Sequence, residues 1–200
     1  MIAVLDYGIG NLRSAQKALQ KVGAEAELTA DPDVVGRAEG VVLPGVGAFG
    51  RCMQALRSAG LEYPAKAAID AGKPFLGICV GMQMLYDGSE EDPDTSGMGV
   101  LGGDVVRLEG EVKLPQMQWN ILDRHRPSLM LDGLAERPWV YFVHSYAPRP
   151  GGHEVATCDY GGPVSAAVER ANVWATQFHP EKSGATGLRL LANFVAATRR

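Results

Sequence analysis

Short apolar runs alternate with amphipathic stretches in the first half of the chain. The apolar runs at residues 2–5, 40–47 and 74–79 have the length and bounding turn residues of buried strands, and "AEAELT" at residues 24–29 is a further strand candidate. Residues 11–23 place Leu12, Ala15, Leu19 and Val22 on one helical face. Helical patterns also cover residues 49–71, with a division near Gly60 and Pro64, and residues 80–88. This alternation predicts an α/β fold whose sheet is largely parallel.

The second half has more strand-like segments and fewer helical ones. Strand candidates occupy residues 99–110, 138–146, 153–161, 163–170 and 173–180, separated by turns. We expect some of them to pair antiparallel and to extend the main sheet. An amphipathic helix at residues 185–200 carries Leu188, Leu191, Ala192 and Val195 on one face. With neither a linker nor a repeat, the pattern predicts one domain over residues 1–200: an open, mostly parallel twisted sheet with helices on both faces and an antiparallel extension.

Composition and charge narrow the classes of function. The 200 residues carry a formal net charge of −4 and no basic cluster, which argues against nucleic acid as a partner. No apolar run reaches the roughly 18 residues of a membrane span, and Asp6 interrupts the first run too early for a signal peptide. Cys52, Cys79 and Cys158 are widely spaced, which favours a reducing, cytoplasmic setting over a disulfide framework. With no CxxC pair and no clustered histidines, we expect no zinc site.

Cys79 occupies a bend with the chemistry of a nucleophile. The stretch "FLGICVGMQ" places it between two glycines, where an apolar strand gives way to a helical pattern. Gly77 and Gly81 would relieve crowding in a tight turn, as glycines do in a nucleophile elbow. At the carboxyl edge of a parallel sheet, N–H groups at the helix start would stabilise a thiolate, and that of Val80 would suit an oxyanion. The alternative is a small buried hydrophobe, which is how we interpret the other two cysteines.

His179 is the best candidate for the base that a cysteine nucleophile needs. It ends the strand candidate "VWATQFHP", and Pro180 favours an extended backbone there. Residues i and i+2 of an extended segment share a face, so the Glu181 carboxylate would fix the tautomer of the imidazole. The alternative is a solvated loop histidine beside an unrelated acid. His144, in the apolar "YFVHSY", suits a pocket wall, with a satisfied core residue as its alternative.

A second glycine-rich turn, "LPGVGAFG", follows the strand at residues 40–47. It lacks the GK[ST] of a Walker motif, so one interpretation is a phosphate loop and the other is a second source of oxyanion N–H groups. Near the N-terminus, "DYGIGN" offers only Gly8-x-Gly10 after a strand, which is a weak signal for dinucleotide binding.

Several of these segments together resemble one known family. "GICVGMQ" and "FHPEKS" are similar to the motifs of class I, triad-type glutamine amidotransferases. With "IAVLDYGIGNLRSA", "LPGVGAFG", "PQMQWN" and "YFVHSY", the chain resembles more narrowly the glutaminase subunits of imidazole glycerol phosphate synthase. The resemblance runs from the first strand to the last helix. Val80 stands where this family usually has leucine, and Gln118 where it usually has glycine.

The resemblance implies hydrolysis of L-glutamine to glutamate and ammonia, with no cofactor and no metal. Cys79 would attack the side-chain amide and form a glutamyl thioester. His179 would protonate the leaving ammonia and then activate water, and Glu181 would orient the imidazole. These three residues are the implied catalytic triad.

The same resemblance implies an oxyanion hole and a glutamine site. One oxyanion donor would be the N–H of Val80, and the other would come from the segment that holds Val46 and Gly47. In the family this segment needs to reorient before it can donate. The implied glutamine contacts are Gly45, Gly47, Gln83, Glu91, Ser145 and Tyr146.

The resemblance finally implies a heterodimer with a (β/α)8-barrel cyclase. In the family the cyclase joins the ammonia to a phosphoribosyl-formimino carboxamide ribotide, giving imidazole glycerol phosphate and an aminoimidazole carboxamide ribotide in histidine biosynthesis. Glutaminase activity stays low until the partner binds its own ligand. The implied partner face is Asn11, Trp119, Asn120, Tyr141 and Lys182. Two alternatives stay open: a glutaminase subunit for another acceptor, and a partner-binding scaffold without catalysis.

Overall fold

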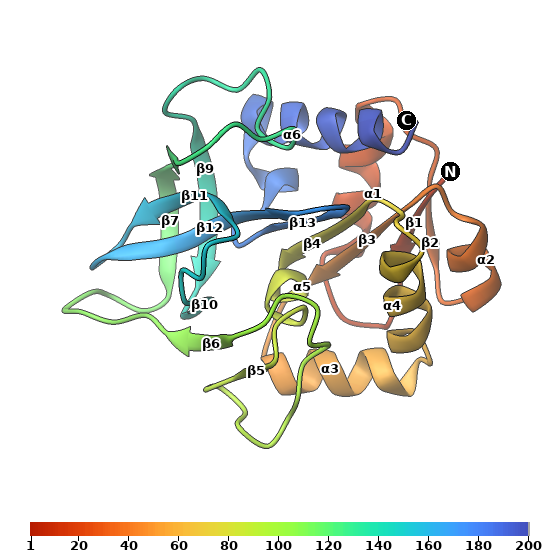
Figure 1. The fold of residues 1–200 in the computed structure, drawn as a ribbon, viewed down its shortest axis with the longest axis horizontal. Coiled ribbons are helices and arrows are strands. Elements are labelled where there is room, and N and C mark those ends of the chain that lie inside the picture. Colours follow the sequence, from red (N-terminus) through yellow and green to blue (C-terminus); the bar gives the residue numbers. More distant parts are fainter. Residues whose placement is uncertain (200) are drawn as a thin grey trace.

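The computed structural model describes residues 1–199 and contains an eight-stranded sheet in the order β2-β1-β3-β4-β13-β12-β11-β8 (Figure 1). The first five strands in this order run parallel. They are β2 (Ala26–Thr29), β1 (Ile2–Leu5), β3 (Gly40–Gly45), β4 (Phe75–Cys79) and β13 (Val173–Thr176). Every residue of β1, β3, β4 and β13 is buried, as expected of parallel strands that are covered on both faces. The predicted α/β class is confirmed.

Helices cover both faces of the sheet (Figure 1). α1 (Leu12–Lys21) and α6 (Gly184–Ala197) lie together on one face, and α3 (Phe49–Ser58) and α4 (Glu62–Asp70) lie on the other. α2 (Pro32–Arg37), which the pattern did not predict, packs beside α4. No helix within residues 1–199 is both long enough and apolar enough to cross a membrane.

Two helical segments end differently from the prediction. α5 (Val80–Gln83) lasts a single turn, because the carbonyls of Met84 and Leu85 accept hydrogen bonds from the loop at residues 98–101. The break within residues 49–71 falls at Gly60, whose φ of 69° ends α3. Pro64 is no breaker, because it lies in the first turn of α4, where no intrahelical N–H is required.

The inner face of α6 is partly as predicted. Leu191 and Val195 are buried as expected, Leu188 and Ala192 are half-buried, and Leu190 and Phe194, which were not expected on this face, are buried. The ring of Phe194 packs edge-on against Trp174 of β13, with 5.8 Å between centroids. This aromatic contact turns the Phe194 side of the helix toward the sheet.

The predicted antiparallel extension is also confirmed. It consists of β12 (Pro163–Arg170), β11 (Glu154–Asp159) and β8 (Asp123–Arg124). The remaining strands form two smaller sheets, one of β10 (Tyr146–Pro148), β6 (Asp104–Arg107) and β5 (Gly88–Ser89), and one of β7 (Gln116–Ile121) and β9 (Trp139–His144). The strand candidates at residues 99–110 and 138–146 therefore lie outside the main sheet.

β7 was not predicted as a strand, although its sequence "QMQWNI" alternates polar and apolar residues; its apolar residues Met117 and Trp119 are exposed rather than part of a core. Its pairing with β9 makes it a strand, and Gln118 lies opposite Phe142 in that pairing. Gln118 is not among the residues with positive φ. The glutamine at this position is therefore compatible with an ordinary extended backbone.

Candidate active site

A cavity of about 250 Å³ opens where the chain leaves β3, β4 and β13. Open α/β sheets place their ligands at this carboxyl edge. All but two of its lining residues, Pro115 and Val143, were singled out from the sequence. The lining residues are Val46, Gly47, Cys79, Val80, Gln83, Glu91, Pro115, Val143, His144, Ser145, Tyr146 and His179.

Cys79 sits on a strained turn between β4 and α5. Its φ of 55° and ψ of −112° lie in a region that residues with a side chain rarely adopt. The turn is closely packed, because a Cβ on Gly81 would lie 1.9 Å from the Leu43 carbonyl oxygen. A Cβ on Gly77 would lie 2.8 Å from the carbonyl oxygen of Gly81. This packing holds the strained backbone and keeps the thiol at the wall of the cavity.

The side chains of His179 and Glu181 meet although the backbone between them is not extended. His179 has extended dihedral angles, but Pro180–Lys182 form a 3₁₀ turn, η1. His179 Nδ1 lies 2.8 Å from Glu181 Oε1, and the two side chains are 1% and 3% exposed. A turn, rather than the predicted extended segment, brings the imidazole and the carboxylate together.

The imidazole of His179 lies between a carboxylate and a thiol. Burial opposes its charged form, but the Cys79 thiol and the Glu181 carboxylate outweigh burial and raise the pKa of His179 to about 9. Because Nδ1 donates to Glu181, Nε2 is left for the substrate, and it has no hydrogen-bond partner within residues 1–199. The arrangement places a nucleophile, a base that can carry a proton and an orienting carboxylate in one site.

Ser183 fixes this turn, and sequence reasoning missed it. Its hydroxyl donates to the His179 carbonyl at 2.7 Å and accepts from the Tyr141 N–H at 3.0 Å. The His179 N–H in turn donates to the Tyr141 carbonyl at 3.0 Å. The backbone of the histidine is therefore tied to β9 in both directions. No local motif signals this role, because one of the two partner groups, the Tyr141 N–H, comes from a distant strand.

Two buried side chains hold the glycine-rich segment after β3. The Tyr7 hydroxyl donates to the Pro44 carbonyl at 2.6 Å, and the Cys52 thiol donates to the Val46 carbonyl at 3.4 Å. Burial raises the pKa of Cys52 to about 11, so the sulfur keeps the proton that it donates. Cys52 is buried as predicted, but it also makes a polar contact. Gly47, with a φ of 101°, then turns the chain along the cavity wall.

A buried amide network adjoins the thiol. Gln83 Nε2 donates to the Tyr146 carbonyl at 2.8 Å and to Gln177 Oε1 at 3.1 Å. Gln177 Nε2 donates to Cys79 Sγ at 3.7 Å. His144 Nδ1 also donates to the Tyr146 carbonyl, at 2.9 Å, and burial lowers the pKa of His144 to about 4, so this ring is neutral at pH 7. Sequence reasoning missed Gln177, although it stands immediately before "FHPEKS".

Two of the expected glutamine contacts have partners within the protein. Glu91 lines the cavity, and its Oε2 accepts the Phe49 N–H at 2.8 Å at the start of α3. Gly45 does not line the cavity: a Cβ there would lie 2.6 Å from the backbone nitrogen of Gly81. Its small size lets β3 approach the elbow, and its contact with glutamine stays a prediction. Ser145 lines the cavity as expected.

The β7–β9 ribbon carries an exposed apolar face. Trp119 and Tyr141 lie opposite each other in the pairing, with their ring centroids 6.0 Å apart. Met117 and Trp139 belong to the same face by alternation and are 63% and 54% exposed. Exposed aromatic and methionine side chains gathered on one surface are typical of an interface. Sequence reasoning named the first pair and missed the second.

The other expected partner residues differ in how free their side chains are. Asn120 Nδ2 donates to the Asp159 carbonyl at 2.9 Å, so this amide secures the ribbon to the turn after β11. Asn11 Oδ1 accepts from the Ser14 hydroxyl at 2.7 Å, just before α1. Lys182 is exposed at the end of η1. Of the three, Lys182 is the side chain most accessible to another molecule.

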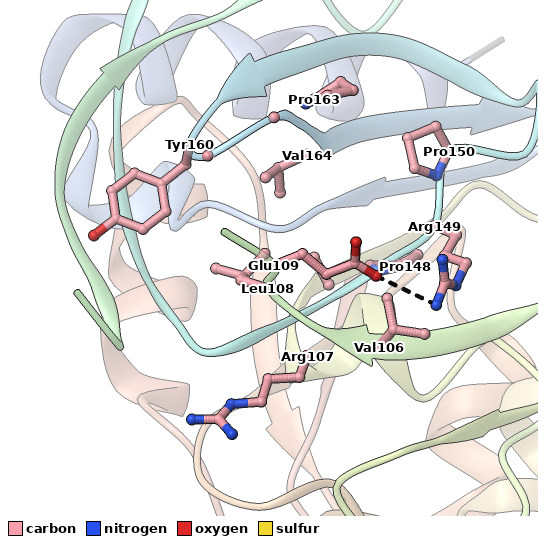
Figure 2. A pocket seen from close by; sticks show the side chains of 13 residues that line it. Val106, Arg107, Leu108, Glu109, Pro148, Arg149, Pro150, Tyr160, Pro163 and Val164 are labelled. Carbon is pink, nitrogen blue, oxygen red and sulfur yellow. Dashed lines mark ion pairs between the residues drawn. The ribbon is translucent and has the colours of Figure 1, made fainter. Parts of the chain in front are cut away.

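A second hollow, of about 260 Å³, lies between β6, β10 and the turn before β12 (Figure 2). Arg149 and Glu109 form an ion pair across it at 3.5 Å, and both are largely exposed. Neither a cysteine nor a histidine is among its lining residues. Within residues 1–199, no three His, Cys, Asp or Glu side chains gather as a metal site would require. The cavity at Cys79 is therefore the candidate active site.

Comparison with known proteins agrees with this site. The family profile "Glutamine amidotransferase class-I" matches residues 3–198. Imidazole glycerol phosphate synthase subunit HisH of Rhodopirellula baltica is 50% identical over 201 residues, which cover 98% of this chain and 98% of that protein. The subunit of the same name from Methanothermobacter thermautotrophicus is 48% identical over 200 residues, with 100% of both chains covered. The structure of PurLQS from Thermotoga maritima aligns with a TM-score of 0.77 at 21% identity, covering 98% of this chain and 97% of that chain, which supports the fold.

The chain belongs to the class-I glutamine amidotransferases, whose profile spans nearly its whole length. The identities of about half over essentially complete chains narrow this assignment. Within the class, the chain belongs to the HisH family of imidazole glycerol phosphate synthase subunits.

Proposed function

We propose that this chain hydrolyses L-glutamine to glutamate and ammonia as the glutaminase subunit of an imidazole glycerol phosphate synthase. The observation that carries the proposal is the buried pair of His179 and Glu181. Nε2 of His179 has no hydrogen-bond partner within residues 1–199, and His179 lines the same cavity as Cys79. The identity of the substrate, L-glutamine, is inferred from membership of the family.

Cys79 gives its thiol proton to His179 Nε2, Sγ attacks the side-chain carbonyl carbon of glutamine, and the carbonyl oxygen takes up the negative charge. Backbone N–H groups of Val80 and of the segment with Val46 and Gly47, which line the cavity, stabilise this oxyanion. When the tetrahedral intermediate collapses, the C–N bond breaks and His179 Nε2 gives its proton to the leaving nitrogen. Ammonia departs and a glutamyl thioester remains on the sulfur.

Hydrolysis of the thioester restores the enzyme. His179 Nε2 removes a proton from water, the oxygen of that water attacks the thioester carbonyl, and the C–S bond breaks to release glutamate. Nδ1 donates a hydrogen bond to Glu181 throughout. The proton that is given and taken in the two steps is therefore the one on Nε2. Our proposed glutamine contacts are Gly45, Gly47, Gln83, Glu91, Ser145 and Tyr146.

The ammonia passes to a (β/α)8-barrel cyclase that docks as the second subunit of a heterodimer. The exposed face of the β7–β9 ribbon, with Trp119 and Tyr141, supports a docking surface for another protein. Asn11, Asn120 and Lys182 complete the proposed interface. All three cysteines are free, which supports a cytoplasmic location, where thiols stay reduced.

The test is glutamate production by the purified chain, first alone and then with the cyclase and a ligand of the cyclase. We expect low turnover alone and a marked increase with the loaded partner. Turnover that rises only with the glutamine-dependent partner of another pathway would favour a different acceptor. Folded protein that makes no glutamate under any of these conditions would favour the non-catalytic scaffold and overturn the proposal.

A further inference from the structure

Two buried glutamines join the wall of the cavity to the nucleophile. Gln177 is fully buried and Gln83 is 3% exposed. Together they form a chain of three hydrogen bonds, from the Tyr146 carbonyl through both amides to Cys79 Sγ. The mechanism described above assigns no role to the Gln177 amide.

The direction of every hydrogen bond in this chain is set by its first member. A backbone carbonyl only accepts, so the group of Gln83 that faces Tyr146 must be its NH₂. The same NH₂ faces Gln177, which must therefore present its oxygen in return. The NH₂ of Gln177 is left to face the sulfur of Cys79. Reversing the Gln177 amide would set two NH₂ groups against each other, so this orientation is strongly preferred.

We propose that Gln177 is a further catalytic residue, whose amide N–H donates to the sulfur of Cys79 and stabilises it as a thiolate. The role rests on the proposed function, because it concerns the same nucleophile. A neutral donor favours the ionised thiol through hydrogen bonding alone.

The test measures the ionisation of Cys79 directly. Each protein is alkylated with iodoacetamide between about pH 5 and pH 9, and the Cys79 peptide is followed by mass spectrometry. Cys52 and Cys158 react slowly in the folded protein, because burial raises their pKa values to about 11 and about 12. The pH midpoint of Cys79 alkylation therefore reports on this thiol alone.

Gln177→Glu is the sharpest variant, because its carboxylate can still accept from Gln83 but presents an acceptor to the sulfur. We expect its alkylation midpoint to rise by about one pH unit or more. Gln177→Leu removes the donor without adding charge, so its midpoint should rise by less. Turnover should fall about 10-fold in kcat with KM little changed, as expected when transition-state stabilisation is lost.

Gln116→Leu is the matched control. Gln116 donates to Cys158 Sγ at 3.7 Å and is fully buried, so the variant removes an equivalent contact from another cysteine. Its Cys79 midpoint should equal that of the unaltered protein. Circular dichroism and a cooperative unfolding transition establish that each variant is folded. If neither Gln177 variant folds, Gln83→Met replaces them, because it frees the Gln177 amide to turn away from the sulfur and should also raise the midpoint.

An unchanged midpoint in the folded variants overturns the role of Gln177, even if turnover falls, since a purely structural residue can affect turnover without affecting ionisation of the thiol. The alkylation readout needs no glutamine. Absence of turnover in the unaltered protein would thus overturn the proposed function alone, and the midpoints would still decide the role of Gln177.

Discussion

Two buried glutamines each direct an amide N–H at a cysteine sulfur 3.7 Å away, Gln177 at Cys79 and Gln116 at Cys158. The contacts are alike in donor, distance and burial, yet the two thiols have different surroundings. Cys158 lies within β11, opposite Val164, and lines neither of the two cavities described above. Burial raises the pKa of Cys158 to about 12, although the contact with Gln116 acts in the opposite direction.

Cys79 differs from Cys158 in three ways. Its backbone is strained into a turn, its sulfur lines a cavity, and a buried imidazole lies beside it. At Cys158 the amide donor does not offset the effect of burial on the pKa of the thiol. The elbow and His179 make the thiol available for reaction, and Gln177 adds to them. The predictions below test each of these differences.

The largest effect is expected when the two cysteines are removed in turn. Cys79→Ser should lower glutamine turnover by at least about 10³-fold, because a hydroxyl is a far weaker nucleophile at neutral pH. Cys158→Ala should retain turnover. Glutamate production by the complex measures both. A Cys79→Ser protein with more than about a tenth of the turnover would remove Cys79 from its role.

Removal of the orienting carboxylate should come next. Glu181→Gln should lower kcat/KM by about 10²-fold and shift the alkaline limb of its pH profile. His179 is charged below its pKa of about 9 and loses its proton as the pH rises through that value. Without the Glu181 carboxylate the pKa falls toward the usual value of about 6.5, so the limb should move to lower pH. An unmoved limb in this variant would show that another group limits the rate at high pH.

The elbow should respond to a single methyl group. Gly81→Ala puts a Cβ 1.9 Å from the Leu43 carbonyl oxygen, so the backbone of one of the two must shift. We expect the free energy of unfolding to fall by about 2–3 kcal/mol, as measured by urea denaturation. Gly36→Ala in α2 is the control: its Cβ would meet open space, and stability should be kept or rise by up to about 1 kcal/mol. Equal effects in the two variants would contradict the crowding at the elbow.

The smallest effect is expected on the Cys158 side of the comparison. Gln116→Leu removes one hydrogen bond to sulfur and should cost about 1 kcal/mol of stability. Glutamine turnover should stay within about twofold of the unaltered protein. A tenfold loss of turnover in folded Gln116→Leu would show that the two glutamine–cysteine pairs are not independent.

The parallel core could be predicted because its signals are local. Unbroken apolar runs and their bounding glycines mark β1, β3 and β4, and the glycines around Cys79 mark the elbow. β7 has alternating polar and apolar residues but no unbroken apolar run, and its apolar residues Met117 and Trp119 are exposed, so the signal of a buried strand is missing. Propensity therefore predicted the centre of the sheet better than its surroundings.

The same distinction holds within the site. Cys79 and His179 could be singled out because each follows an apolar strand at an unusual turn. Gln177 and Ser183 could not, because their partner groups lie far away in the sequence: the Gln83 amide and the Cys79 sulfur for Gln177, and the Tyr141 N–H for Ser183. Gly45, which the sequence predicts to contact the substrate, has a packing role that the sequence did not indicate. Residues that act through tertiary contacts are thus the ones that sequence reasoning misses.

The position of β13 has a consequence for how the enzyme folds during its synthesis. This strand is made near the end of synthesis, yet it inserts between β4 and β12 in the middle of the sheet. His179 follows it directly, so the thiol and its base cannot meet until almost the whole chain has left the ribosome. At about 5–20 residues per second, the edge of β4 stays unpaired for seconds and needs shielding from other chains. The nucleophile Cys79 is thus synthesised early, and His179, the base that activates it, is synthesised near the end.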